Sequence, residues 1–125
     1  MNVLVDTSIW IDFFRNFEMA DSLEQLIEEN LIVINDLILA EIIPQLSIHD
    51  QIELISLLHE IEKQPLTIDW DNIIQMQITC LRNGINGIGI PDFIIAQNAI
   101  QGNLRLFSKD KHFGLIAKLI GLIQY

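Results

Sequence analysis

Short apolar segments rich in β-branched residues alternate along this chain with longer segments of helical periodicity. The apolar segments predict strands at 2–5, 31–35, 65–68 and 104–107, with 121–125 as a candidate fifth. Short continuous apolar runs are typical of parallel strands buried on both faces. The segments between them predict helices at 7–16, 19–31, 37–46, 49–63, 70–83, 91–102 and 110–120. This alternation predicts an α/β fold with three layers, α/β/α, around a mainly parallel sheet of four to five strands.

Local signals fix several helix ends. Asp36 is a candidate N-cap for the helix at 37–46, and Pro44 should kink or end that helix. Pro91 suits the first turn of a helix and Gly102 suits its end. These residues predict where the helices begin and end.

The length of 125 residues predicts one domain, residues 1–125, with a single hydrophobic core. No apolar run reaches the roughly 18 residues of a membrane-spanning helix. Asp6 interrupts the first apolar run, where a signal peptide would continue. The single cysteine, Cys80, excludes an internal disulfide. These features predict a cytoplasmic protein without a membrane partner.

The chain carries 17 acidic and 7 basic residues, for a net charge of −10. Nucleic-acid-binding proteins usually present a basic face, so this total argues against such a partner unless phosphates are reached through a bound cation. Solvated helix faces account for most of the acids. The segment 105–118 is the basic exception, with four bases and one acid.

Four acids are not explained by a solvated helix face. Asp6 ends the first strand, Asp92 opens a helix, and Asp110 follows the strand at 104–107. Glu41 has apolar neighbours on both sides, where an unpaired carboxylate is costly. Simpler interpretations exist, because Asp6 and Asp110 suit helix N-caps and Asp92 suits a helix N-terminus electrostatically. The carboxyl ends of parallel strands share one edge of a sheet, however, so these acids are expected to meet there.

Carboxylates that share one pocket require a cation, because each otherwise suppresses the ionisation of its neighbours. Oxygen ligands suit Mg²⁺ or Mn²⁺. Cys80 is alone, and His49, His59 and His112 are scattered, so no cysteine and histidine set has the spacing of a zinc site. A carboxylate site of this kind indicates phosphoryl chemistry.

Four segments, "VLVDTSIWIDFFR", "LAEI", "PDFIIAQNA" and "LFSKDKHF", resemble in this order the signature segments of PIN-domain ribonucleases, most closely the VapC-type toxins of toxin–antitoxin pairs. The resemblance spans essentially the whole chain. It implies a catalytic acidic site and supporting hydroxyls made by Asp6, Glu41, Asp92 and Asp110 with Ser8 and Ser108. Of these, Asp6, Asp92 and Asp110 would hold the metal.

Asp12 and His112 are two further positions within the signature segments. Asp12 matches a common family residue and is interpreted as structural. His112 stands where many members have a further acid, two residues after the fourth aspartate, so the number of metal ions stays open.

The resemblance implies a Mg²⁺- or Mn²⁺-dependent endoribonuclease toxin. A metal-activated water would attack a phosphodiester and leave a 5′-phosphate and a 3′-hydroxyl. Arg15, Lys109 and Lys111 are candidates for contact with the RNA backbone.

The resemblance also implies a protein antitoxin, and clustered carboxylates would attract an arginine from such a partner. The helices containing "LEQLI" and "LILAEII" are expected to line a groove for its apolar residues. A homodimer is expected as well, because 50% of the residues are hydrophobic and a small core leaves apolar helix surface exposed.

Two other interpretations remain open. A PIN-like domain without catalysis would serve as an interaction module. A phospho-acceptor receiver domain is also a small acidic α/β domain with a magnesium pocket, but it needs adjacent acids after the first strand. Asp69 is its only candidate acceptor here. RNA cleavage assayed with and without EDTA separates the three.

Overall fold

A parallel β-sheet with the strand order β3-β2-β1-β4 lies at the centre of this computed structural model, which describes residues 1–15 and 20–125. β1 lies between β2 and β4, with Val3 opposite Ile32 of β2 and Val5 opposite Phe107 of β4. The strands are β1 (Val3–Val5), β2 (Ile32–Ile34), β3 (Glu62–Lys63) and β4 (Arg105–Phe107).

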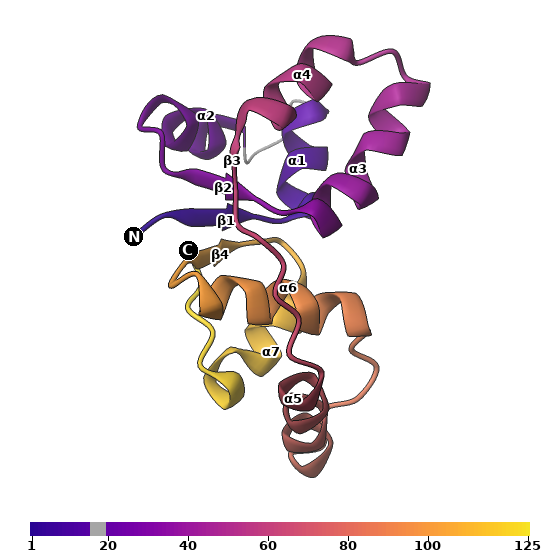
Figure 1. Ribbon diagram of the computed structural model, residues 1–125, viewed down its shortest axis with the longest axis vertical. Coiled ribbons are helices and arrows are strands. Elements are labelled where there is room, and N and C mark those ends of the chain that lie inside the picture. The colour runs from indigo at the N-terminus through magenta and orange to yellow at the C-terminus, as the bar shows by residue number, and fades with distance from the viewer. Residues whose placement is uncertain (16–19) are drawn as a thin grey trace.

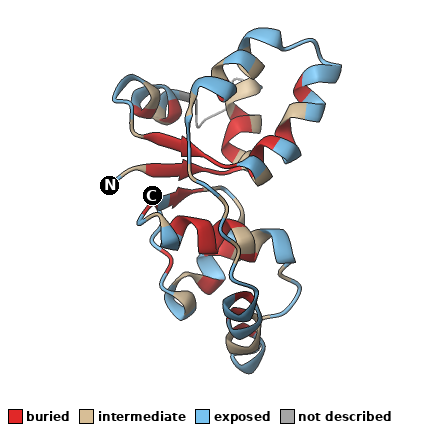
Figure 2. Cartoon of the chain, viewed as in Figure 1, coloured by how far each residue is buried: buried red, intermediate tan, exposed pale blue. Residues whose placement is uncertain are grey.

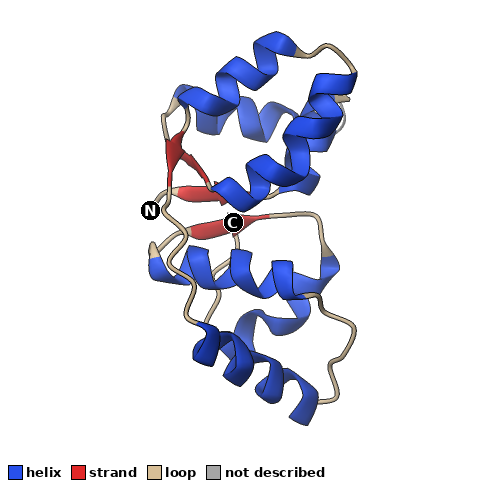
Figure 3. Cartoon of the chain, turned by 45° about the vertical axis from the view of Figure 1, so that its right-hand side comes forward, coloured by secondary structure: helices blue, strands red, loops and turns tan. Residues whose placement is uncertain are grey.

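The helices of the described chain form two groups. In Figure 1, α1 to α4 lie on one side of the strands and α5 to α7 on the other, and the turned view of Figure 3 keeps this division. The predicted α/β/α arrangement around a parallel sheet is therefore confirmed, with four strands. The helices are α1 (Thr7–Phe14), α2 (Ala20–Glu28), α3 (Asp36–Ile48), α4 (Ile52–Glu60), α5 (Trp70–Arg82), α6 (Ile90–Gln101) and α7 (Lys111–Ile120).

The hydrophobic core lies on both faces of the sheet. β1 and β2 are buried along their whole length, as the red strands in Figure 2 show. Trp10 of α1, Phe93 of α6 and Phe113 of α7 are fully buried. The indole Nε1 of Trp10 donates a hydrogen bond to the carbonyl of Val5 at 3.2 Å, which satisfies the buried donor. This packing fixes the position of the residues that follow β1.

The predicted strand at 65–68 is wrong. The third strand is instead the exposed pair Glu62–Lys63, whose polar residues carry no strand signal. Residues 65–68 run past α6, whose amide side chains bind their carbonyls: Asn98 Nδ2 donates to Pro65 at 3.0 Å, and Gln101 Nε2 donates to Thr67 at 2.8 Å. Side chains of α6 thus bind two carbonyls of the apolar run where a strand would have backbone partners.

The candidate fifth strand at 121–125 is reduced to one isolated parallel bridge between Leu106 and Gln124. This segment begins with Gly121, the C-cap of α7, which has the left-handed conformation with a φ of 78°. Such a terminus suits glycine because it has no Cβ.

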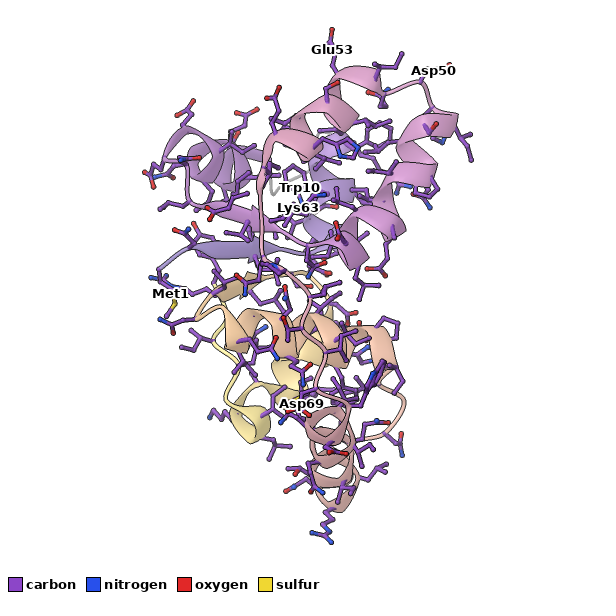
Figure 4. All side chains as sticks on the ribbon, in the orientation of Figure 1. Met1, Trp10, Asp50, Glu53, Lys63 and Asp69 are labelled. Atoms are coloured by element: carbon purple, nitrogen blue, oxygen red, sulfur yellow. The ribbon has the colours of Figure 1, made fainter. Side chains whose placement is uncertain are left out.

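The start of α3 also differs from the prediction. Asn35, not Asp36, is the N-cap, and its side-chain oxygen accepts a hydrogen bond from Ile38 N at 2.8 Å. Asp36 is the first helical residue and forms an exposed ion pair, at 3.2 Å, with Lys63, which Figure 4 labels. Of the two alternatives for Pro44, a kink or an end of the helix, the end is wrong, because α3 continues to Ile48.

The other predicted helices are present, but two are shorter than predicted. α2 ends at Glu28 and not at residue 31, and α4 covers Ile52–Glu60 and not 49–63, because Glu62–Lys63 form β3. α6 has Pro91 in its first turn and Gly102 as its C-cap. The predicted ends at Asn16 and Met19 lie outside the described residues. Within the described residues, none of the helices is long and apolar enough to cross a membrane.

Candidate active site

Asp6 follows β1 directly and occupies the N-cap position of α1, yet its side chain makes no capping hydrogen bond. The residue is only 6% exposed. Its Oδ2 accepts a hydrogen bond from Ser108 Oγ at 2.7 Å and another from Ser8 Oγ at 3.2 Å. Asp6 therefore occupies the N-cap position without capping α1 through its side chain. Its carboxylate is oriented by two hydroxyls and not by the helix.

The same hydroxyls connect the loop after β1 with the loop after β4. Ser8 Oγ accepts a hydrogen bond from Lys109 N at 2.9 Å, and Ser108 Oγ accepts one from Asp110 N at 3.0 Å. These contacts are possible because β1 and β4 pair in parallel, so both loops leave the same edge of the sheet. Within the described residues, Asp6 Oδ1 accepts no hydrogen bond, so this oxygen is available to a ligand.

Asp110 does act as a helix cap. Its Oδ1 accepts a hydrogen bond from His112 N at 2.9 Å at the start of α7. The capping role does not remove it from the cluster of acids, because ligand atoms of Asp92, Asp110 and His112 all lie within 4.8 Å of one another. The cap and the cluster are two uses of the same side chain.

Asp92 lies in the first turn of α6, half-buried beside Asp110 and His112. Burial raises the pKa of its carboxyl, and the negative charges of Asp110 and Asp6 raise it further, while His112 opposes the shift. Desolvation and like charges both disfavour the ionised form. The carboxyl is thus short of compensating positive charge.

Glu41 is exposed, so the expectation of an apolar environment is wrong. Its sequence neighbours Leu39 and Ile42 point into the core instead. Its Oε1 accepts a hydrogen bond from Thr7 Oγ1 at 3.2 Å. Partial burial raises the pKa of Glu41, the Thr7 hydroxyl lowers it, and the charges of Asp6 and Asp92 raise it further.

The four acids therefore interact electrostatically although they come from four parts of the chain. Asp6 follows β1, Glu41 lies on α3, Asp92 opens α6 and Asp110 caps α7. Thr7 is the partner that the sequence did not single out for a role. Its position directly after Asp6 was the available signal.

The three basic candidates lie in different surroundings. Lys109 Nζ forms an ion pair with Asp12 Oδ2 at 2.7 Å, and Asp12 is buried. This contact gives Asp12 a structural partner and occupies the lysine. Arg15 and Lys111 are both exposed.

The apolar side chains of α2 and α3, the helices expected to line a groove, are divided between core and surface. Leu23, Leu26 and Ile38 are buried, whereas Ile48 at the end of α3 is exposed. A surface pocket lies instead against α1, α2 and α4, lined by Phe13, Phe14, Glu24, Gln51, Glu53, Leu54 and Leu57. Its lining combines apolar side chains with two acids.

Asp69, the candidate phospho-acceptor, has a structural role. It caps α5, where its Oδ1 accepts a hydrogen bond from Asn72 N at 3.1 Å, and Figure 4 labels it at this helix start. Gln97 binds both its backbone N–H and its carbonyl, at 3.1 Å and 3.0 Å. These contacts explain Asp69 without a receiver function.

A family model described as the PIN domain matches residues 3–119. No curated protein matches the chain. Similar folds occur in three solved complexes: VapBC2 from Rickettsia felis bound to a DNA fragment from their promoter, VapBC-1 from nontypeable Haemophilus influenzae, and a toxin–antitoxin complex from Klebsiella pneumoniae.

The Rickettsia felis chain has a TM-score of 0.78 and 23% identity, over 100% of this chain and 98% of that one. The Haemophilus influenzae chain has a TM-score of 0.71 and 24% identity, over 100% and 97%. The Klebsiella pneumoniae chain has a TM-score of 0.65 and 22% identity, over 90% of each. These TM-scores show a shared fold. Because the PIN family model covers nearly the whole chain and all four acids, the chain belongs to the PIN domain family.

Proposed function

We propose that this chain is an endoribonuclease that requires a divalent metal ion, Mg²⁺ or Mn²⁺, and acts as the toxin of a toxin–antitoxin pair. The observation that carries the proposal is the convergence of Asp6, Glu41, Asp92 and Asp110, with raised pKa values at Glu41 and Asp92. Raised pKa values in a cluster of acids indicate a site that requires positive charge. Membership of the PIN family and the likeness to solved toxin–antitoxin complexes agree with this role.

The donor set fits a divalent metal ion. Ligand atoms of Asp92, Asp110 and His112 lie within 4.8 Å of one another. Asp6 lies outside this group, but its charge acts on Asp92, and one of its oxygens accepts no hydrogen bond from the described residues. Lys109 does not neutralise these acids, because its ammonium binds Asp12. We assign Asp6, Asp92 and Asp110 as the residues that would hold the metal, since hard divalent cations prefer oxygen ligands.

When bound, a divalent metal ion polarises a phosphate oxygen and lowers the pKa of a water molecule. The residues of the chain provide the arrangement around it. Ser8 and Ser108 orient Asp6 through their hydroxyls. Thr7 orients Glu41, whose raised pKa and exposure suit it to accept a proton from water at the cluster. The expected products carry a 5′-phosphate and a 3′-hydroxyl.

The remaining contacts concern partners. Arg15 and Lys111 are exposed and remain our candidates for the RNA backbone. Lys109 could join them only by leaving Asp12. A protein antitoxin would neutralise the acid cluster with an arginine, because a guanidinium group can bind two carboxylate oxygens at once.

Cleavage of RNA tests this proposal. Purified protein is incubated with RNA and Mg²⁺ or Mn²⁺, with and without EDTA, beside the variants Asp6→Asn and Asp92→Asn. We expect cleavage that EDTA abolishes and that either variant reduces by at least about a hundredfold. Asp36→Asn, on an exposed ion pair, is the matched control and should keep full activity. Undiminished cleavage in EDTA would contradict the metal requirement, and a folded but inactive wild type would favour an interaction module.

A further inference from the structure

His112 is the one histidine of the described chain that faces the acid cluster. Its Nδ1 lies 3.3 Å from Asp110 Oδ1 and 3.6 Å from Asp92 Oδ2. The Nδ1 atom itself is buried and has no hydrogen-bond partner among the described residues, although the side chain as a whole is 44% exposed. A buried polar atom without a hydrogen-bond partner lowers the stability of a fold, so we expect a ligand at this nitrogen.

The start of α7 fixes this ring beside the acids. Asp110 caps the helix by accepting a hydrogen bond from the backbone N–H of His112. The side chains of Asp110 and His112 are therefore held in one turn, and Asp92 approaches them from the start of α6. The backbone of His112 is thus held beside Asp110 by a contact that does not depend on the imidazole.

The distances resemble those between ligands of one metal ion. Nδ1 is nearly equidistant from the two carboxylates and makes a well-aligned hydrogen bond with neither. Ligand atoms at about 2.0–2.2 Å from a common ion lie roughly 3 to 4 Å from one another. A simple ion pair would favour close contact with one carboxylate.

We propose that His112 Nδ1 is a ligand of the metal ion held by Asp92 and Asp110, and that it makes the site prefer Mn²⁺ or another first-row transition ion over Mg²⁺. The inference rests on the metal site of the proposed function. Imidazole nitrogen is a good ligand for transition ions, whereas Mg²⁺ prefers oxygen. The resemblance puts an acid at this position in many PIN domains, so His112→Asp restores an oxygen ligand without lengthening the side chain.

Electron paramagnetic resonance with Mn²⁺ tests the inference without measuring activity. Metal-free protein is titrated with Mn²⁺ and then studied by pulsed measurement of ¹⁴N couplings. The wild type should bind Mn²⁺ with a directly coordinated nitrogen. His112→Asp and His112→Ala should lose the ¹⁴N coupling. His59→Gln, at an exposed position of α4, is the matched control and should keep it.

Competition between the two ions gives a second readout. The ratio of the Mg²⁺ and Mn²⁺ dissociation constants should fall by about tenfold or more in His112→Asp relative to the wild type. Mn²⁺ bound by the wild type without ¹⁴N coupling would overturn this inference and leave the proposed nuclease intact. No Mn²⁺ binding by the wild type would overturn the metal site itself, and with it both proposals.

Discussion

At the scale of single residues, two aspartates at helix N-cap positions behave differently. Asp110 caps α7, whereas Asp6 leaves its helix uncapped and binds the hydroxyls of Ser8 and Ser108. The difference arises because Ser108 approaches Asp6 from the neighbouring strand, at 2.7 Å. A hydrogen bond to an ionised acceptor is strong enough to determine the orientation of its side chain.

Asp92→Asn should stabilise the metal-free protein at pH 7. Burial, Asp110 and Asp6 raise the pKa of Asp92 in the folded state, so its ionised form costs stability at neutral pH. For a raised carboxyl pKa, the stability of the wild type increases as the pH falls through the folded value. The advantage of the variant should therefore disappear near pH 4, where the unfolded carboxyl also binds a proton. Urea unfolding in EDTA at both pH values measures this.

Asp36→Asn is the control for that measurement. Asp36 forms an exposed ion pair with Lys63, and its loss should leave stability nearly unchanged or slightly lower at pH 7. A marked loss of stability in Asp92→Asn would mean that Asp92 is a structural partner of His112 and not an uncompensated acid.

At the scale of elements, local sequence signals predicted α6 well and β3 not at all. Pro91 and Gly102 act within one helix, so the chain segment alone contains the information. β3 is an exposed two-residue strand, Glu62–Lys63, whose pairing depends on β2. The run at 65–68 was predicted as a strand because it is apolar. Its actual partners are side-chain amides of α6 about thirty residues away, which a local pattern does not reveal.

The start of α3 shows the same limit. Asn35 and Asp36 are adjacent and both suit an N-cap, so local preference does not choose between them. Asn98 determines which residue is the N-cap, because its Oδ1 accepts a hydrogen bond from Asn35 Nδ2 at 2.9 Å inside the protein. A contact over 63 residues of sequence cannot be read from a local pattern.

Asn35→Ala should therefore be far more costly than Asp36→Ala. The first leaves Ile38 N and the buried Asn98 Oδ1 without a partner, for a loss of about 2–4 kcal/mol in the free energy of unfolding. The second removes an exposed ion pair and should change stability by less than about 0.5 kcal/mol. Chemical denaturation of both variants compares them, and equal losses would contradict the assignment of Asn35 as the cap.

Residue types predicted which side chains belong to the candidate site, but not how each one is oriented. Sequence reasoning proposed the four acids and both serines as one site. In the structure the charge of Asp6 acts on Glu41 and Asp92, and both serines donate hydrogen bonds to Asp6. Sequence reasoning did not find the exposure of Glu41 or the ion pair between Lys109 and Asp12. Both depend on which way a side chain points, and sequence spacing does not determine that.

At the scale of the whole molecule, exposed apolar residues on α5 and α7 bear on self-association. Trp70, Ile74 and Leu81 of α5 are each at least 50% exposed, and Leu115 of α7 is 58% exposed. These two helices pack against each other in the same helix group. Exposed apolar surface of this kind often marks an interface.

We expect a homodimer that Ile74→Lys disrupts, because a buried lysine in an apolar interface is unfavourable. Light scattering at micromolar concentrations measures the mass of both proteins. Ile48→Lys is the control, since Ile48 is 77% exposed at the end of α3 in the other helix group. A dimer that is lost in Ile48→Lys but kept in Ile74→Lys would place the interface on the other helix group. A monomeric wild type would contradict the expected dimer.

An antitoxin arginine at the acid cluster would compete with Mg²⁺ for the same oxygens. Linkage then requires each ligand to weaken the binding of the other. Raising free Mg²⁺ should lower antitoxin affinity more than NaCl of equal ionic strength does, as calorimetry can measure. Asp6→Asn should remove the difference. Equal effects of Mg²⁺ and NaCl on the wild type would mean that the antitoxin blocks RNA access without entering the cluster.

The hydroxyl contacts of Asp6 also have a consequence for synthesis. Ser8 lies near the start of the chain, and its partners Ser108 and Lys109 come about a hundred residues later. A ribosome adding about 5–20 residues per second needs roughly 5–20 s to make the intervening chain. Until the end of that time, Asp6 exists without Ser108 or Asp110 beside it. The proposed nuclease therefore stays harmless to the RNA that encodes it until the last strand has emerged and paired with the first.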